Sequence, residues 1–251
     1  MSNVREVQAK SVLNRSKIHP YCLNPYTGCQ VGCAYCYARL FIPRYSGHTE
    51  PWGSFVDAKV NAPDLLRRQL VRARRETVWV SSVCDPYQPC EARYGLTRRC
   101  LEELLRHEMP VEIQTKSALV RRDIDLLVRF KDLGVGFTVT TDDESTRRLF
   151  EPHASPILER IQVLGELHQL GIRTFAFIGP LIPADPDRLA GLLAGQVDYV
   201  LVDRLNYGAM FRDFYVRHGL EAFLEESFFR LQKARLAAAL RRQALDFEML
   251  F

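Results

Sequence analysis

The sequence lacks any run of about 18 consecutive apolar residues, so no membrane-spanning helix is expected. It also lacks the basic start and apolar stretch of an export signal, because residues 1–17 are polar and mixed in charge. We therefore expect a soluble, cytoplasmic protein. At 251 residues with 47% hydrophobic content, the chain is long enough to bury one α/β domain of barrel size.

Lysine is scarce in this chain. Six of the 34 basic residues are lysine, which leaves 28 arginines, whereas 30 acidic residues bring the formal net charge to only +4. The planar guanidinium suits phosphate and carboxylate groups, so this bias permits a nucleic-acid substrate. Solvated helix faces, such as the one that carries Arg67 and Arg68, explain the same bias without any ligand. The composition therefore leaves the substrate class open.

Short apolar runs rich in β-branched residues alternate with helical patterns along the chain. The runs predict strands at Ile18–Leu23, Thr77–Val83, Val111–Thr115, Val135–Thr140, Arg173–Ile178 and Tyr199–Val202. Helices with cap or proline start signals, or a glycine stop, are predicted at Asp64–Arg75, Arg98–His107, Arg122–Asp132, Ile157–Leu170 and Asp187–Ala194. Each strand-to-strand interval has room for a crossover helix, so the strands should be parallel.

These elements predict an α/β fold, either a partial or complete barrel or an open doubly wound sheet. We expect an N-terminal segment at 1–17, the barrel at 18–207 and a C-terminal helical extension at 208–251 that ends in an apolar-acidic tail. The carboxyl ends of parallel strands meet at one edge, where chemistry collects. The residues after the strands include Cys84 and Asp85, Lys116 and Ser117, Asp142 to Glu144, and Asn206 and Tyr207.

Seven cysteines are an odd number in a chain without a predicted export signal, and both facts argue against a disulfide framework. Cys29, Cys33 and Cys36 form a C-x3-C-x2-C spacing on a loop that also contains Gly28 and Gly32. Three thiolates can hold three irons of a cubane cluster and leave the fourth iron open, whereas an electron carrier normally closes all four corners. The glycines permit the tight backbone turn that such a loop needs.

The other cysteines bear on two alternatives. A zinc site could use Cys22 as a fourth thiolate, although zinc usually takes two separated pairs of ligands. The chain would then be a zinc-stabilised nucleic-acid-binding module without catalysis. Cys84, Cys90 and Cys100 lack the spacing of an auxiliary cluster, so a single cluster is predicted.

The cysteine spacing, with Tyr35 in the aromatic position before the third cysteine, resembles the signature of the radical S-adenosylmethionine superfamily. Within it the chain is similar to the spore photoproduct lyase-like (SplB-like) family. The matching segments are Asn24–Arg39, Ser81–Pro89, Gly95–Arg98, Gln114–Ser117 and Glu151 with Pro152. The resemblance implies a partial (β/α)6 TIM-type barrel and a [4Fe-4S] cluster whose open iron binds S-adenosylmethionine. Reductive cleavage of S-adenosylmethionine then gives a 5′-deoxyadenosyl radical that abstracts hydrogen from a substrate.

The resemblance also implies roles for residues that match by position. Tyr35 is expected against the adenine, Lys116 with its neighbour Ser117 near the methionine carboxylate, and Asp85 at the methionine amine. Each residue has an ordinary alternative role. Tyr35 could be a core aromatic residue, Lys116 a solvated loop residue, and Asp85 the cap of the turn that Pro86 begins.

Cys84 is the candidate hydrogen-atom donor. The resemblance places a donor cysteine near the end of the second strand, at the position of Ser82, and alternate strand residues share a face. A small buried hydrophobic residue is the alternative role for Cys84.

The resemblance implies partners as well. An external electron donor of the flavodoxin or ferredoxin type is expected, and the substrate class it suggests is a nucleobase or a nucleic acid. Radical modification of a peptide or a small metabolite is the second enzymatic possibility.

Overall fold

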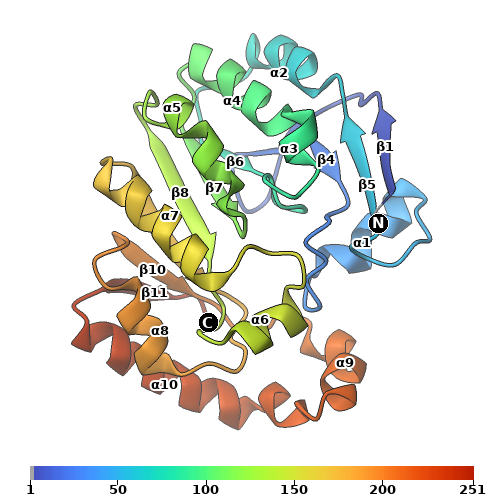
Figure 1. Cartoon of the computed structure of the whole chain (residues 1–251). Helices are drawn as coiled ribbons and strands as arrows, with labels where there is room; N and C mark the ends of the chain where they lie inside the picture. Colours follow the sequence, from blue (N-terminus) through green and yellow to red (C-terminus); the bar gives the residue numbers. More distant parts are fainter. Residues whose placement is uncertain (1–2) are drawn as a thin grey trace. The chain divides into compact units, whose positions relative to one another are not determined.

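The structure, a computed structural model, describes residues 3–251 (Figure 1). The chain forms two compact units, of which the first contains the residues up to Gly32 and Ala38–Val135, and the second contains Cys33–Tyr37 and Gly136–Phe251. The division falls inside strand β8 (Leu133–Thr138) and inside the cysteine loop. The domain limits drawn from the sequence, at 17/18 and 207/208, stay a prediction.

A small sheet opens the first unit. Strand β1 (Asn3–Val7) pairs in parallel with β5 (Phe55–Lys59), and β5 pairs antiparallel with β4 (Tyr26–Thr27). Arg5 donates two hydrogen bonds to the carboxylate of Asp57 across β1 and β5, at 2.8 and 3.1 Å. The sequence did not predict this sheet, because β1 is mostly polar and β4 has only two residues.

The longer series of strands in the first unit runs in the order β2-β3-β6-β7. Strand β2 (Leu13–Arg15) is antiparallel to β3 (Tyr21–Leu23), whereas β3, β6 (Val78–Val80) and β7 (Val111–Thr115) are parallel. Burial alternates residue by residue along β7, as a strand with period two requires.

The expected start signals hold only in part in the first unit, because helix α4 (Leu96–Arg106) begins two residues before the predicted Arg98 and has Gly95 at its N-cap. Helix α2 begins one residue before Pro63, and α2 contacts α4. The predicted helix at Arg122–Asp132 is wrong, because that segment holds only the end of a 3-10 turn and one short α-helix. The helical elements are α1 (Ala38–Ser46), α2 (Ala62–Leu70), α3 (Glu91–Tyr94), α4 (Leu96–Arg106), η1 (Ala118–Asp123) and α5 (Ile124–Leu127).

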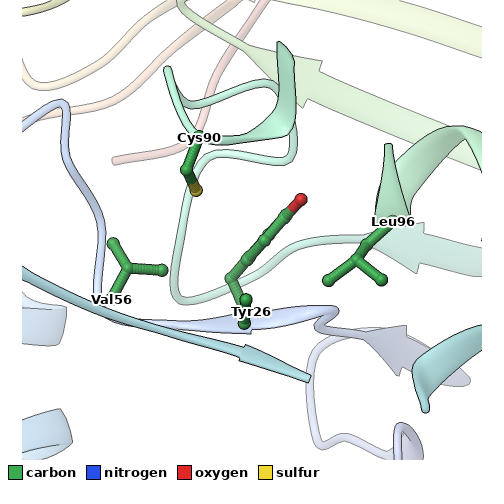
Figure 2. Packing of buried hydrophobic residues seen from close by; sticks show 5 residues of the cluster. Tyr26, Val56, Cys90 and Leu96 are labelled. Carbon is green, nitrogen blue, oxygen red and sulfur yellow. The ribbon is translucent and has the colours of Figure 1, made fainter. Parts of the chain in front are cut away.

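A hydrophobic cluster in the first unit buries the start of the cysteine loop. Figure 2 shows Tyr26 between Leu96 on one side and Val56 and Cys90 on the other; Ala58 completes the cluster. Each of the five residues is 7% exposed or less. Tyr26 lies two residues before Gly28, so packing against strand β5 fixes the chain where it enters the loop.

The strands of the second unit are parallel. Strand β10 (Tyr199–Val202) lies between β9 (Arg173–Ile178) and β11 (Asp246–Met249). Helices α8 and α10 contact each other, and α10 also contacts β11. The helical elements are α6 (Glu144–Phe150), α7 (Ile157–Gln169), α8 (Pro186–Leu193), η2 (Gly208–Phe211), α9 (Arg212–Arg217), η3 (Glu221–Leu224) and α10 (Glu226–Arg242).

The expected α/β class with parallel strands is confirmed. The predicted strands at 111–115, 173–178 and 199–202 have the bounds given from the sequence, whereas β3 and β6 are shorter than expected. The tail at 246–251 contains β11, which was not predicted. No helix within residues 3–251 is long and apolar enough to cross a membrane.

Candidate functional site

The cysteine loop begins at a position where only glycine fits. Gly28 has a φ of +84°, and a Cβ atom built there would lie 2.5 Å from the carbonyl oxygen of Phe55. Gly32 has a φ of +66°. Both glycines thus hold the left-handed backbone that glycine adopts without a steric penalty, as the loop was expected to require.

None of the cysteines in the described chain forms a disulfide bond. Cys29 and Cys33 are buried and Cys36 is half-buried. Cys29 belongs to the first unit and the other two belong to the second. Among residues 3–251, no three His, Cys, Asp or Glu side chains gather around one metal position. The ligand set of Cys29, Cys33 and Cys36 therefore rests on the sequence spacing and stays a prediction.

The surroundings of Cys29 fit a thiolate ligand of an iron-sulfur cluster. The backbone N–H of Asp85 donates to Cys29 Sγ at 3.3 Å. Gln88, which is fully buried, accepts the N–H of Gln30 at 2.9 Å and donates to the carbonyl oxygen of Gly28 at 3.4 Å. Hydrogen bonds to ligand sulfurs tune a cluster, and a braced backbone fixes the ligand.

The carboxylate of Asp85 accepts three hydrogen bonds from residues of the first unit. Its Oδ1 accepts hydrogen bonds from Thr115 Oγ1 at 2.7 Å and from the N–H of Tyr87 at 2.9 Å, and its Oδ2 accepts the N–H of Lys116 at 2.7 Å. Asp85 thus caps its own turn and ties the segment after β6 to the end of β7. Its expected role at the methionine amine stays a prediction.

Ser117 also acts within the chain. Its Oγ accepts the N–H of Leu119 at 3.3 Å and so caps the 3-10 turn η1, while its own N–H donates to Thr115 Oγ1 at 3.0 Å. Lys116 is half-buried directly after β7. The roles of Lys116 and Ser117 near a methionine carboxylate stay predictions.

Tyr35 lies deep in the second unit. Its hydroxyl donates to Glu151, and its ring centroid lies 6.4 Å from that of Phe150. Burial and the adjacent Glu151 carboxylate raise the pKa of Tyr35 well above its usual value. Its hydroxyl is therefore a hydrogen-bond donor to the protein, and its expected contact with adenine stays a prediction.

Cys84 packs beside the hydrophobic cluster of the first unit, and its Sγ lies 3.6 Å from the carbonyl oxygen of Tyr26. Strand β6 ends at Val80, and Ser81 has a φ of +68°, so Ser82 and Cys84 do not share a strand face. The alternation argument for a shared face is therefore wrong. Burial raises the pKa of Cys84 to about 11, which keeps the thiol protonated. Its role as hydrogen-atom donor stays a prediction.

The acidic residues after β8 serve the local fold. Asp142 accepts the N–H of Asp185 at 2.8 Å, and Asp143 caps α6 by accepting the N–H of Thr146 at 2.7 Å. Glu144 lies in the first turn of α6. Asp143 is thus a helix cap and Glu144 a first-turn acid, the positions where a helix favours negative charge.

The residues after β10 are less enclosed. Asn206 donates to Asp203 at 3.0 Å, and Tyr207 is 55% exposed. Burial raises the pKa of Asp203 above its usual value. No interaction of these residues assigns them to a substrate.

Sequence reasoning missed two polar interactions near the start of the loop, one made by the half-buried Lys59 and one by the buried Tyr26. Lys59 donates to the carbonyl oxygen of Asn24 at 2.8 Å, and burial lowers the pKa of Lys59. The hydroxyl of Tyr26 donates to the fully buried Glu91, which also accepts a hydrogen bond from Arg122 at 2.8 Å. Lys59 ends strand β5, which was not predicted, so no sequence signal placed it there.

Comparison with known proteins gives the chain a family. The family model described as the radical SAM superfamily matches residues 23–192. An uncharacterized protein of Methanocaldococcus jannaschii is 34% identical over 227 residues, which cover 89% of this chain and 84% of that protein. A radical SAM Nα-GlyT isomerase of Pseudomonas phage M6 is 27% identical over 161 residues, which cover 63% of this chain and 32% of that protein.

Solved structures share the fold. A mutant of spore photoproduct lyase matches with a TM-score of 0.72 at 13% identity, covering 99% of this chain and 82% of that one. SuiB of Streptococcus suis bound to S-adenosylmethionine matches with a TM-score of 0.62 at 11% identity, covering 92% and 50%. Since the family model spans more than half of the sequence, this chain belongs to the radical S-adenosylmethionine superfamily, an enzyme family that implies a [4Fe-4S] cluster and S-adenosylmethionine as cofactors.

Proposed function

We propose that Cys29, Cys33 and Cys36 hold the [4Fe-4S] cluster and that the enzyme abstracts hydrogen from a nucleobase or nucleic-acid substrate. When bound and reduced, the cluster supplies the electron that cleaves S-adenosylmethionine into methionine and a 5′-deoxyadenosyl radical. A flavodoxin-like or ferredoxin-like protein is the proposed source of that electron. The observation that carries the proposal is the C-x3-C-x2-C spacing inside the matched segment.

The residues of the chain contribute position and exclusion of water. The N–H of Asp85 is aimed at the sulfur of Cys29, and Gln88 holds the backbone on both sides of that cysteine. Cys29 and Cys33 are 7% and 6% exposed, so their sulfurs are screened from solvent. A screened site protects a reactive radical from side reactions.

The substrate class is supported by two observations. One solved structure that shares the fold is spore photoproduct lyase complexed with dinucleoside spore photoproduct, with a TM-score of 0.71 at 13% identity. The arginine content, 28 residues, also permits phosphate contacts. The second candidate is peptide modification, favoured by the match to SuiB bound to its precursor peptide SuiA, with a TM-score of 0.62 at 13% identity.

The cluster is tested by reconstitution without oxygen. We expect about four irons per chain and the visible absorption of an iron-sulfur cluster, which bleaches on reduction. Cys33→Ala should abolish both signals, whereas the matched control Cys100→Ala changes a buried cysteine outside the loop and should keep them. Full iron content in Cys33→Ala would refute the ligand set. Colourless protein that contains zinc, lost in Cys22→Ala, would support the zinc alternative.

The substrate is tested by the release of 5′-deoxyadenosine. Reconstituted enzyme with S-adenosylmethionine and a low-potential reductant is given oligonucleotides in one series and peptides in the other. Release above the uncoupled background with oligonucleotides supports the proposal. Stimulation by peptides alone would replace it with peptide modification.

A further inference from the structure

Two consecutive residues at the end of helix α6 hold two consecutive residues of the cysteine loop. The carbonyl oxygen of Phe150 accepts the N–H of Ala34 at 2.8 Å, and the carboxylate of Glu151 accepts the hydroxyl of Tyr35. Ala34 and Tyr35 are the residues between Cys33 and Cys36. All of these residues belong to the second unit, in which Figure 1 shows α6.

The carboxylate of Glu151 also contacts residues outside the cysteine loop. Arg160 Nη1 lies 2.6 Å from Glu151 Oε2, and Thr140 Oγ1 donates to Oε1 at 2.9 Å. Arg160 donates further to the carbonyl oxygens of Thr138 at 2.9 Å and Ser155 at 2.7 Å. The carboxylate thus connects the loop to strand β8 and helix α7.

The carboxylate of Glu151 and the guanidinium of Arg160 are both buried. Glu151 is 0% exposed and Arg160 is 1% exposed. A buried carboxylate is costly unless it is paired and hydrogen-bonded, and a salt bridge to Arg160 alone would leave part of its capacity unused. The hydroxyl of Tyr35 is, beside that of Thr140, a second hydroxyl donor to Oε1 of this carboxylate.

We propose that Glu151 is a positioning residue that, through Tyr35, fixes the Cys33–Cys36 segment for its ligand role. This inference rests on the proposed function for what the segment binds, but the anchoring itself is a property of the chain without a cluster. Tyr35 and the carbonyl oxygen of Phe150 together set the course of the backbone between the two cysteines. Without the carboxylate, the segment opens and its thiols become accessible.

The test labels the reduced, cluster-free full chain with iodoacetamide and measures the rate at each cysteine by peptide mass spectrometry. A hydrogen bond to a charged group is strong enough that its loss shifts an opening equilibrium by about tenfold or more. Tyr35→Phe, which removes the hydrogen bond, should therefore speed the labelling of the buried Cys33 about tenfold, since slow labelling reports the open population. Glu151→Gln keeps an acceptor oxygen but loses the charge, so it should speed the labelling of Cys33 by a smaller factor. Labelling of Cys100 in the first unit should not change.

Tyr215→Phe is the matched control in the same unit. Tyr215 is 1% exposed, its ring centroid lies 5.5 Å from that of Phe150, and within residues 3–251 its hydroxyl has no hydrogen-bond partner. Removing that hydroxyl should leave the labelling of Cys33 and Cys36 unchanged. The urea dependence of labelling separates local opening from unfolding of the unit, because local opening exposes little surface and has a shallow slope.

Wild-type labelling rates at Cys33 and Cys36 in both Tyr35→Phe and Glu151→Gln would overturn the proposal. A tenfold rise with the steep urea slope of unfolding would overturn it as well. In reconstituted protein, Tyr35→Phe should shift the reduction potential of the cluster and speed its loss to a chelator, while Tyr215→Phe should do neither. If the wild-type chain binds no iron, the proposed function fails, yet the labelling result still decides whether Glu151 holds the segment.

Discussion

The change Asp85→Asn separates two roles for one carboxylate. The structure gives Asp85 three donors, and an amide cannot accept all three, because either orientation turns an N–H₂ group toward a backbone N–H. One hydrogen bond is lost and the other two lose the charge of the acceptor. Hydrogen bonds to charged groups contribute about 1.5–3 kcal/mol and neutral ones about 0.5–1.5 kcal/mol, so we expect a loss of about 3.5–6 kcal/mol of unfolding free energy.

The assay is urea unfolding of the cluster-free chain, followed by circular dichroism at neutral pH. Thr115→Val is the graded comparison: it leaves the carboxylate but removes one of its donors, together with the acceptor of the Ser117 N–H, and should cost about 2–4 kcal/mol. The backbone N–H of Asp85 also donates to Cys29, so Asp85→Asn should in addition shift the reduction potential of the reconstituted cluster. If Asp85→Asn unfolds at the wild-type urea midpoint and instead weakens S-adenosylmethionine binding, the turn-capping role is refuted.

Three further predictions concern the fold. Gly28→Ala should lower the unfolding free energy by about 2 kcal/mol or more in a urea titration, because its Cβ would lie 2.5 Å from a carbonyl oxygen at a φ of +84°. The variant should also take up less iron on reconstitution, and a wild-type urea midpoint would contradict the prediction. Asp185→Ala removes the cap of α8, which accepts two N–H groups, and should cost about 1 kcal/mol in the same titration, a loss that Asp185→Asn should largely avoid. Burial raises the pKa of Cys84 to about 11 from about 8.5 in an unfolded chain, so folding favours the neutral thiol. That stabilisation is complete below pH about 8.5 and is lost as pH rises to about 11, so Cys84→Ala should show a smaller decline of its urea midpoint over this range, and an equal decline would refute the shift.

The regular elements were predictable where one local signal decided them. Strands at 111–115, 173–178 and 199–202 are apolar and β-branched, and their bounds follow from the sequence. Helices α7 and α8 start at proline positions, and Asp185 caps α8 with its side chain. The prediction failed where pairing over long sequence distances decided the structure. Strand β1 pairs with residues more than 50 positions away and is held there by Arg5 and Asp57, which no local pattern indicates.

The residues of the candidate site could be predicted from the sequence, but the hydrogen bonds that hold them could not. The cysteine spacing and the two glycines identify the loop from the sequence alone. The braces around it come from Gln88 and Glu151, whose partners lie about 60 and 116 positions away in the chain. From the sequence, Glu151 was named only as part of a segment that resembles the family, and this residue was assigned no role. Which polar groups a loop recruits depends on the packing of distant elements, and a periodicity argument cannot supply that information.

The polar residues after the strands were expected to face a ligand, and in the structure several of them also make hydrogen bonds within the chain. Asp85 and Glu151 are buried carboxylates: Asp85 accepts hydrogen bonds from donors of its own unit, and Glu151 accepts the hydroxyl of Thr140 and forms a salt bridge with Arg160. Each also reaches the cysteine loop, Asp85 by its backbone N–H to Cys29 and Glu151 by Tyr35. A ligand loop of the proposed kind would need a rigid backbone, and a buried, hydrogen-bonded carboxylate is a rigid anchor. In this chain both acids are tied to the cysteine loop, so their removal should lower the stability of the cluster-free protein, measured by urea unfolding.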